Sequence, residues 1–447
     1  MKKFIETISN IWKIEELRQR ILVTLGLLLV YRFGAQVVLP GIDTNELASL
    51  NATAGEGILG LLNAFTGGAF ANASVFALGI MPYISASIVV QLMGIAIPYL
   101  QKLQKEGESG RKTINQITRW LTIAICVVQA PAYLYGLSAL GVPETAFLLG
   151  KGLDFVIPSV IILVTGTIFA MWLGEKITDK GIGKGISLLI MIGIIATMPQ
   201  SLVQEFISRT TNNTGGIMFM LIEVIIWFLV ILASVLLVMA IRQIPVQYAR
   251  RTATGGYEKN MMGSRQYIPL KLNASGVMPI IFAQAIMFAP SLLGKTFNNT
   301  AVGQWMEVQF ADIFGLWYNV LFGILIIIFT YFYTAITVPT NKMADDLKRS
   351  GGFIPGIRPG KETGDYLDKI MSLITFPGSI FLALLAVLPA VVVKLMDVQA
   401  GWALFYGGTS LLIMVGVAID TVQQVNSYLL NRHYDGLMKT GKNRKVA

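Results

Sequence analysis

Histidine and cysteine, the residues that most often carry catalysis or bind metals, each occur once in this chain of 447 residues. They are His433 and Cys126, which are too few for an internal disulfide, a Cys/His metal cluster or a Cys-His catalytic pair. Glu223 and Asp420, acids within apolar stretches, are isolated in the sequence, whereas an intramembrane protease needs paired carboxylates or a serine with a histidine. A Walker-type phosphate loop is also absent from the sequence. We expect no enzyme, no metal and no cofactor.

Basic residues could bind an anionic partner, and twelve of them lie in two segments, residues 242–271 and 340–369. In the first, IPVQYARR and QYIPLKLN flank Gly255 and Gly256, which predicts an extended hairpin. In the second, FIPGIRPG predicts a rigid Pro/Gly turn between two helical stretches. Such loops often serve only to set membrane topology. Their patterning nevertheless favours an ordered basic platform that docks a large anionic partner.

The elements that position these residues are apolar helices. The composition is 54% hydrophobic and 13% charged, with a mean hydropathy of +0.64, whereas soluble proteins have about 25% charged residues. The apolar runs approach the roughly 20 residues that span a hydrocarbon core, and they do not alternate as barrel strands do. Ten spans are predicted, centred on residues 21–39, 75–98, 115–137, 154–173, 185–203, 217–241, 273–293, 316–338, 370–391 and 402–422. Within the second span, Pro82 is expected to break the helical ladder.

Placing the N-terminus inside sorts 30 of the 35 basic residues to the cytoplasmic side. Both termini are therefore predicted to be cytoplasmic, with a tail at residues 423–447. Residues 1–20 mix lysine and arginine with apolar side chains, which is typical of an amphipathic helix on the membrane surface. No small-residue cleavage site follows the first apolar run, so this segment is not expected to be a cleaved signal.

A short apolar stretch, residues 58–65, lies between the first two spans and is bracketed by glycines. Eight residues cannot cross a bilayer as a helix. The pattern leaves two structures open: an outer amphipathic loop, or a short re-entrant helix inside a protein cavity.

Six sequence segments, spread from the second span to the tenth, together resemble the SecY family of bacterial protein-conducting channels. They are SVFALGIMPYISASIVVQL, GEKITDKGIGKGISLLI, IPVQYARR, YIPLKLNASGVMPIIFA, GGFIPGIRPGKET and FYGGTSLLI. The resemblance covers essentially the whole chain. One departure is Lys184, where the family commonly carries asparagine. It lies at the cytoplasmic end of a span where a lysine can snorkel, so we expect a neutral change.

The resemblance implies an all-α polytopic membrane protein of ten helices. Two pseudo-symmetric inverted halves, residues 21–205 and 217–422, would surround a central pore and be joined by an external hinge loop at residues 206–216. A re-entrant plug helix at about residues 57–70 would include Gly57, Leu59, Leu61, Leu62, Asn63 and Phe65. The apolar pore ring implied by the family would be Ile80, Ile84, Ile186, Ile190, Ile281 and Ile413. An isoleucine in a membrane helix more often contacts lipid or packs in the core than lines a pore.

The implied function is a channel that carries unfolded preproteins across the bacterial inner membrane and releases transmembrane segments sideways into lipid. The implied partners are the small subunits SecE and SecG, the SecA ATPase, the ribosome, preproteins with their signal peptides, and anionic lipid. Polar residues of the lateral gate would be Ser85, Ser87, Gln91, Gln129 and Asn273, for which ordinary interhelical hydrogen bonding is an equal alternative. The docking residues would be Arg250, Arg251, Arg358, Pro359 and Gly360. The alternative function is a secondary transporter with inverted repeats.

Overall fold

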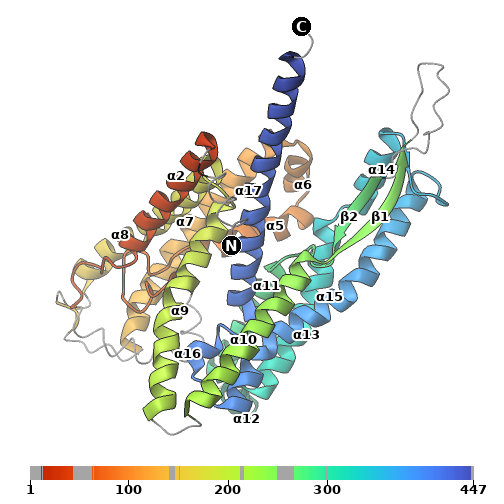
Figure 1. Ribbon diagram of the computed structural model, residues 1–447. Coiled ribbons are helices and arrows are strands. Elements are labelled where there is room, and N and C mark those ends of the chain that lie inside the picture. Colours follow the sequence, from red (N-terminus) through yellow and green to blue (C-terminus); the bar gives the residue numbers. More distant parts are fainter. Residues whose placement is uncertain are drawn as a thin grey trace, which may run out of the picture. The chain divides into compact units, whose positions relative to one another are not determined.

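The computed structural model describes residues 12, 14–43, 63, 65–139, 146–148, 150, 152–211, 216–248, 266–296 and 301–443 (Figure 1). The chain divides into two compact units. Unit 1 contains Met1–Ile207, Ala400–Trp402 and Gly416–Ala447, and unit 2 contains Ser208–Gln399 and Ala403–Val415. The division at Ile207 falls at the predicted hinge loop, but the C-terminal helix belongs mostly to unit 1 and not to the second half.

Unit 1 is built from helices. They are α2 (Glu15–Gly34), α5 (Met81–Ala96), α6 (Pro98–Lys105), α7 (Glu108–Ala139), α8 (Leu153–Lys180), most of α9 (Gly185–Thr211) and most of α17 (Gly408–Asn443). Helix α5 packs against α7, α7 packs against α8, and α2 packs against α8. A buried apolar cluster that includes Leu39, Ala77, Leu134, Phe147 and Leu163 ties the loops of this unit to α7 and α8.

Two predictions for unit 1 differ from the structure in detail. Helix α2 begins at Glu15, so the border placed at residue 20 falls inside one helix. Helix α5 begins only at Met81, which places Pro82 in the first turn. A proline there loses no helical hydrogen bond, because the first N–H groups of a helix have no partner within it. The break in this span lies instead at Ile97, whose extended backbone precedes Pro98 at the start of α6.

Unit 2 combines helices with a small sheet. Its elements are α10 (Gly216–Met239), β1 (Ile241–Tyr248), β2 (Gln266–Lys271), α11 (Met278–Thr296), α12 (Ala301–Ala311), α13 (Leu316–Thr337), α14 (Thr340–Arg349), β3 (Gly352–Phe353) and α15 (Lys361–Met396). The four-residue α16 (Ala400–Ala403) follows α15 and has residues in both units. Helix α13 packs against α11 and α15, and α10 also contacts α15.

The sheet of unit 2 confirms the strands of the predicted hairpin. Strands β1 and β2 pair antiparallel with Ile244 opposite Ile268, and β3 adds to the other edge of β1 with Phe353 opposite Gln247. The hairpin lies beside α14 and α15 (Figure 1). Its Gly255 and Gly256 lie outside the described residues. One face of the sheet is buried in a local core with α14 and α15, made of Ile244, Val246, Leu270, Leu347, Ile354, Leu367 and Met371.

Within the described residues, seven helices are long and apolar enough to cross a membrane, or eight if the bent pair α5 and α6 is one span. The seven are Glu108–Leu137, Leu153–Lys180, Gly185–Thr211, Met218–Met239, Leu316–Arg349, Lys361–Met396 and Gly408–Leu429. Each of the ten predicted ranges overlaps a helix. The ten-span count, the inverted symmetry and the orientation of the termini stay predictions.

Candidate functional site

Four of the six isoleucines predicted to form a pore ring lie in unit 1. Ile80 immediately precedes α5 and is buried, and Ile84 lies in the first turns of that helix, where its N–H donates to the Ile80 carbonyl at 3.1 Å. Ile186 and Ile190 occupy the first two turns of α9 and are partly exposed. Within each pair the four-residue spacing places both side chains on one side of the helix.

The remaining two ring candidates lie in unit 2. Ile281 is partly exposed in the first turn of α11, and Ile413 is buried in α17 at 6% exposure. The structure thus places all six residues near the beginnings of apolar helices. Their assembly into one ring stays a prediction.

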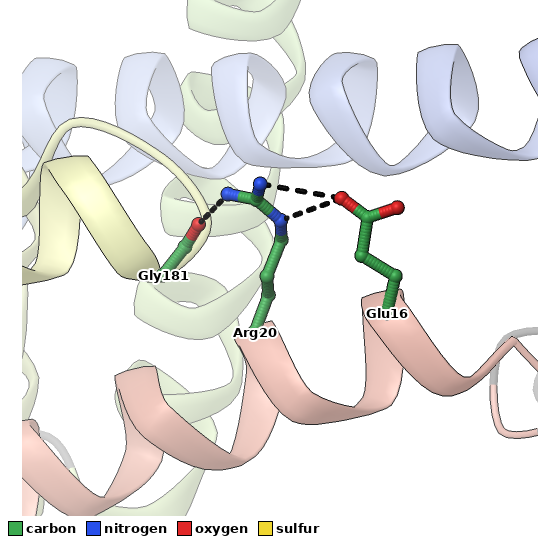
Figure 2. A network of polar contacts seen from close by, with 3 residues as sticks. All are labelled: Glu16, Arg20 and Gly181. Atoms are coloured by element: carbon green, nitrogen blue, oxygen red, sulfur yellow. Dashed lines mark hydrogen bonds and ion pairs between the residues drawn. The ribbon is translucent and has the colours of Figure 1, made fainter.

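The beginning of α9 is positioned by the loop at residues 181–184, which α2 holds on one side (Figure 2). Arg20 donates to the Gly181 carbonyl at 3.4 Å and to Glu16 Oε1 at 3.3 Å. Thr24 Oγ1 accepts a hydrogen bond of 3.0 Å from the Ile182 N–H. These bonds satisfy backbone groups at a junction between two helices, where helical partners are absent.

Helix α17 holds the same loop from another side. The Gly183 N–H donates to Gln424 Oε1 at 2.7 Å, and Lys184 Nζ lies 3.3 Å from Asp420 Oδ2. The expectation that Asp420 is isolated is therefore wrong. The Lys184 side chain is 72% exposed, and an exposed ion pair contributes about 0–1 kcal/mol. Such a small contribution agrees with the expectation that Lys184 is neutral, which stays a prediction.

Only Asn63 and Phe65 of the predicted plug residues can be placed, because Gly57, Leu59, Leu61 and Leu62 lie outside the described residues. Asn63 Oδ1 accepts a hydrogen bond of 3.1 Å from the Ala71 N–H, and the Phe65 side chain is buried. Both residues belong to a turn-rich segment inside unit 1. The prediction of a plug is consistent with this burial and remains untested.

The predicted lateral-gate residues are divided between the units. In unit 1, Gln91 Nε2 donates to Ser87 Oγ at 3.2 Å on α5, while Ser85 and Gln129 are exposed. In unit 2, Asn273 Oδ1 accepts a bond of 3.3 Å from Ser275 Oγ. Gln91, Ser87 and Asn273 thus make short-range hydrogen bonds within their own segments. A gate role for these five residues stays a prediction.

Arg358 projects from the platform of unit 2, and its side chain is 87% exposed. The backbone beneath it is fixed: Ile354 is buried, and Thr363 Oγ1 donates to the Arg358 carbonyl at 2.8 Å. Gly360, which follows Pro359, has φ +115°, a conformation that glycine adopts without steric cost. The turn therefore presents a guanidinium on an ordered base. Arg250 and Arg251 lie outside the described residues.

Comparison with known proteins assigns the family. The SecY family profile matches residues 74–422 of this chain. The chain belongs to the SecY family. The protein translocase subunit SecY of Streptomyces coelicolor is 38% identical over 96% of this chain and 99% of its own length. The SecY subunits of Bacillus licheniformis (38%, covering 97% of this chain and 99% of theirs) and Mycobacterium bovis (39%, covering 95% and 97%) are similarly related.

Solved structures share the SecY-family fold. A protein-conducting channel matches with a TM-score of 0.60 at 18% identity over 92% of both chains. Sec61 from a canine ribosome-channel complex of the endoplasmic reticulum matches with a TM-score of 0.55 at 17% identity over 92% of both chains. A third match, with a TM-score of 0.58 at 19% identity over 92% of both chains, is a SecY structure whose plug domain stabilises the closed channel and maintains a membrane seal. The chain is thus an all-α, multi-pass membrane protein.

A buried ion pair in unit 2 corrects a second expectation about this SecY-family chain. Arg209, near the end of α9, and Glu223, on α10, lie with Nη2 and Oε1 2.6 Å apart, and their side chains are 3% and 1% exposed. Arg209 Nη2 also donates to the Met396 carbonyl at the end of α15, at 2.6 Å. Glu223 is therefore not an isolated membrane acid.

Several contacts at the site were not found from the sequence. Thr24 and Gln424 hold the loop before α9, and Gly193 approaches the segment that carries Phe65. None of these residues carries a motif, since each acts through a partner distant in the chain. Among the described residues, no cluster of His, Cys, Asp and Glu is arranged to hold a metal ion.

Proposed function

We propose that this chain forms the protein-conducting channel of a bacterial protein translocase. It passes unfolded preproteins across the inner membrane and releases apolar segments sideways into lipid. The observation that carries this proposal is the match to SecY subunits along almost the whole length of both chains, at 38% identity for the Streptomyces coelicolor protein. The channel fold of the solved relatives supports it. The chain itself acts as a channel and not as an enzyme.

Energy and targeting come from partners that bind the cytoplasmic platform. The exposed Arg358 on its ordered turn suits a carboxylate of the SecA motor or a phosphate of ribosomal RNA. Two of the matched relatives were solved as ribosome complexes, the canine Sec61 complex and a yeast Ssh1 complex, which supports ribosome binding. The small membrane subunits SecE and SecG and anionic lipids complete the assembly. Signal peptides and preproteins are the transported partners.

The apolar ring suits transport of unfolded chains. Side chains of every chemistry must pass, so a specific polar site would trap some of them. Isoleucine side chains are β-branched and stiff, so a ring of them can close around any polypeptide in the pore without binding it strongly. A lateral exit between the second and third spans and the seventh and eighth would let apolar segments leave, favoured by about 0.5 kcal/mol per central leucine and opposed by about 3 kcal/mol per charge.

The structure counts against the alternative function, a secondary transporter, because the acid Glu223 already has a cationic partner. A coupled transporter needs ionisable groups that bind ions within the membrane. Glu223 is instead paired at 2.6 Å with Arg209, and both side chains are buried. This pairing favours a structural role for the glutamate.

Reconstitution tests the proposed function. The chain is purified with its two small membrane subunits, placed in proteoliposomes, and supplied with the motor ATPase, ATP and a preprotein. Protease protection of the preprotein should depend on ATP and on this chain. A complex that accumulates a small solute against a gradient, and protects no preprotein, would support the transporter instead.

Replacing Ile84 and Ile190 together by serine should raise the ion conductance of the resting complex in planar bilayers. Serine is smaller than isoleucine and hydrates readily, so an apolar constriction would lose its barrier to water and ions. Ile195 on α9 provides the matched control, because its side chain is 36% exposed on the same helix. Equal conductance in the parent, the double variant and the Ile195→Ser control would place Ile84 and Ile190 outside the constriction.

A further inference from the structure

Arg32 is a charged residue in the last turn of helix α2, after the apolar stretch of that helix, which makes it a candidate for a specific role. A charged side chain in a membrane is costly, so it is retained where a partner or a function compensates. Its Nη1 atom donates a hydrogen bond of 2.8 Å to the carbonyl of Gly67. Gly67 lies 35 residues further along, in the segment that follows Phe65.

The backbone at Gly67 also lies against helix α9. A Cβ atom added to Gly67 would lie 2.7 Å from the Cα of Gly193, and one added to Gly193 would lie 2.7 Å from the carbonyl oxygen of Phe65. Separations under 3.0 Å leave no room for a side chain, so both positions require glycine. Gly67 also has φ +67°, which disfavours any residue with a side chain. Two backbones are therefore in direct contact here.

The segment that makes this contact is a closed turn. The Gly68 N–H donates to the Asn63 carbonyl at 3.0 Å, and Thr66 Oγ1 donates to the same carbonyl at 3.3 Å. The Thr66 side chain is only 2% exposed. Both bonds end on the Asn63 carbonyl, so they join the two ends of the turn.

The far side of the segment is tied separately. The Leu39 N–H donates to the Ala73 carbonyl at 2.9 Å, and Tyr133 Oη donates to the Phe70 carbonyl at 2.7 Å. These contacts hold the residues that lead into α5 and do not depend on Arg32 or Gly193. Loss of the contacts at Gly67 would therefore release the turn from α9, while the bonds from the Phe70 N–H to Thr66 Oγ1 and from the Ala71 N–H to Asn63 Oδ1 would still join it to the residues that lead into α5.

We propose that Arg32 and Gly193 form a latch that holds the turn formed by Asn63 and residues 65–68 against α9 in the resting channel. Ile190, a predicted constriction residue, lies three residues before Gly193 on the same side of α9, so the latched turn is adjacent to the constriction. Arg32 and Gly193 are positioning residues: they contact the turn and not the transported chain. This proposal rests on the proposed function, because it assigns the resting seal of that channel to named contacts.

A buried thiol reports on the latch without any translocation. In the full complex with Cys126 replaced by alanine, Thr66→Cys introduces a nearly isosteric side chain at a site that is 2% exposed. Arg32→Gln removes the charged donor to Gly67 and should increase the rate at which a maleimide labels this thiol by about tenfold or more. Arg32→Lys keeps a donor and should restore part of the protection. Arg119→Gln, which removes the α7 member of an ion pair with Glu175 on α8, should leave the labelling rate unchanged.

Gly193→Ala tests the latch from the other helix. Alanine favours the helix itself, so the variant keeps α9 intact while its methyl group displaces the turn. Gly26→Ala on α2 is the matched control, because a Cβ there has no atom within 4 Å. Gly193→Ala should raise both thiol labelling and resting ion conductance, and Gly26→Ala should raise neither.

The outcomes separate the latch from the channel. Unchanged labelling in both Arg32→Gln and Gly193→Ala would overturn the latch, even in a complex that translocates preprotein normally. Faster labelling with unchanged conductance would overturn the assignment of the seal to this turn. A parent complex that translocates no preprotein would count against the proposed function alone, because the labelling comparison does not depend on transport.

Discussion

Replacing Arg209 by leucine should destabilise the complex by about 3–5 kcal/mol, because the Glu223 carboxylate would remain buried without its cation. Both side chains are at most 3% exposed, and their charged atoms are 2.6 Å apart. The same arginine donates to the Met396 carbonyl at 2.6 Å, so its loss also removes a bond from the end of α15. For a unit of this size the midpoint of thermal unfolding should fall by about 10 °C.

The double variant Arg209→Leu with Glu223→Leu is the decisive control. Replacing both members of a buried ion pair by apolar side chains is often neutral or stabilising. We therefore expect the double variant to recover most of the midpoint lost in Arg209→Leu, when unfolding of the detergent-solubilised complex is followed by circular dichroism. A double variant as unstable as the sum of its two single variants would show that the side chains do not stabilise one another.

The positions of the helices were predictable because a long apolar run is a local property of the sequence. The residues at which the helices begin were less predictable. Pro82 was placed inside a span, and it lies in the first turn of α5, since a proline is compatible with a helix start as well as with a break. The strands β1 and β2 were predictable from the residues that flank a glycine pair.

Contacts between distant residues could not be predicted from local patterns. Gly183 and Gln424 are 241 residues apart, and their hydrogen bond depends on how α17 packs in unit 1. The pairing of Glu223 with Arg209 is one such contact, because the sequence gives their separation of 14 positions but not the side of each helix on which the two residues lie. The need for glycine at residue 193 arises from a second backbone, which has no signature in the sequence around it.

Charge reversal at Arg358 should abolish motor-driven translocation, lowering the rate by about tenfold or more while the complex still assembles. The turn that carries Arg358 stands on a core made by the sheet, α14 and α15. Because its backbone is fixed by Ile354 and Thr363, little ordering entropy remains to be lost when the guanidinium binds. A charge-assisted pair with an anionic partner is then worth roughly 1.5–3 kcal/mol, or at least about tenfold in affinity.

Three substitutions distinguish a specific contact from a diffuse positive surface. Arg358→Lys keeps the charge but loses the planar fork of donors, so a bidentate contact predicts that it fails like Arg358→Glu. Arg349→Glu makes the same charge change at an exposed position of α14 on the same platform and should leave the rate near that of the parent. By contrast, charge reversal at Arg250 and Arg251 should mainly weaken ribosome binding and make its salt dependence shallower.

Rates are measured in proteoliposomes with ATP, motor and preprotein, and assembly is checked by co-purification of the small subunits. In the structure, Arg358 Nη1 lies 3.8 Å from Glu362 Oε1. Both side chains are exposed, so this contact is weak enough for a partner to replace it. Translocation at the parental rate by the Arg358→Glu complex would remove Arg358 from docking. Equal losses in Arg358→Glu and Arg349→Glu, with Arg358→Lys unaffected, would instead show that the platform acts through its summed positive charge.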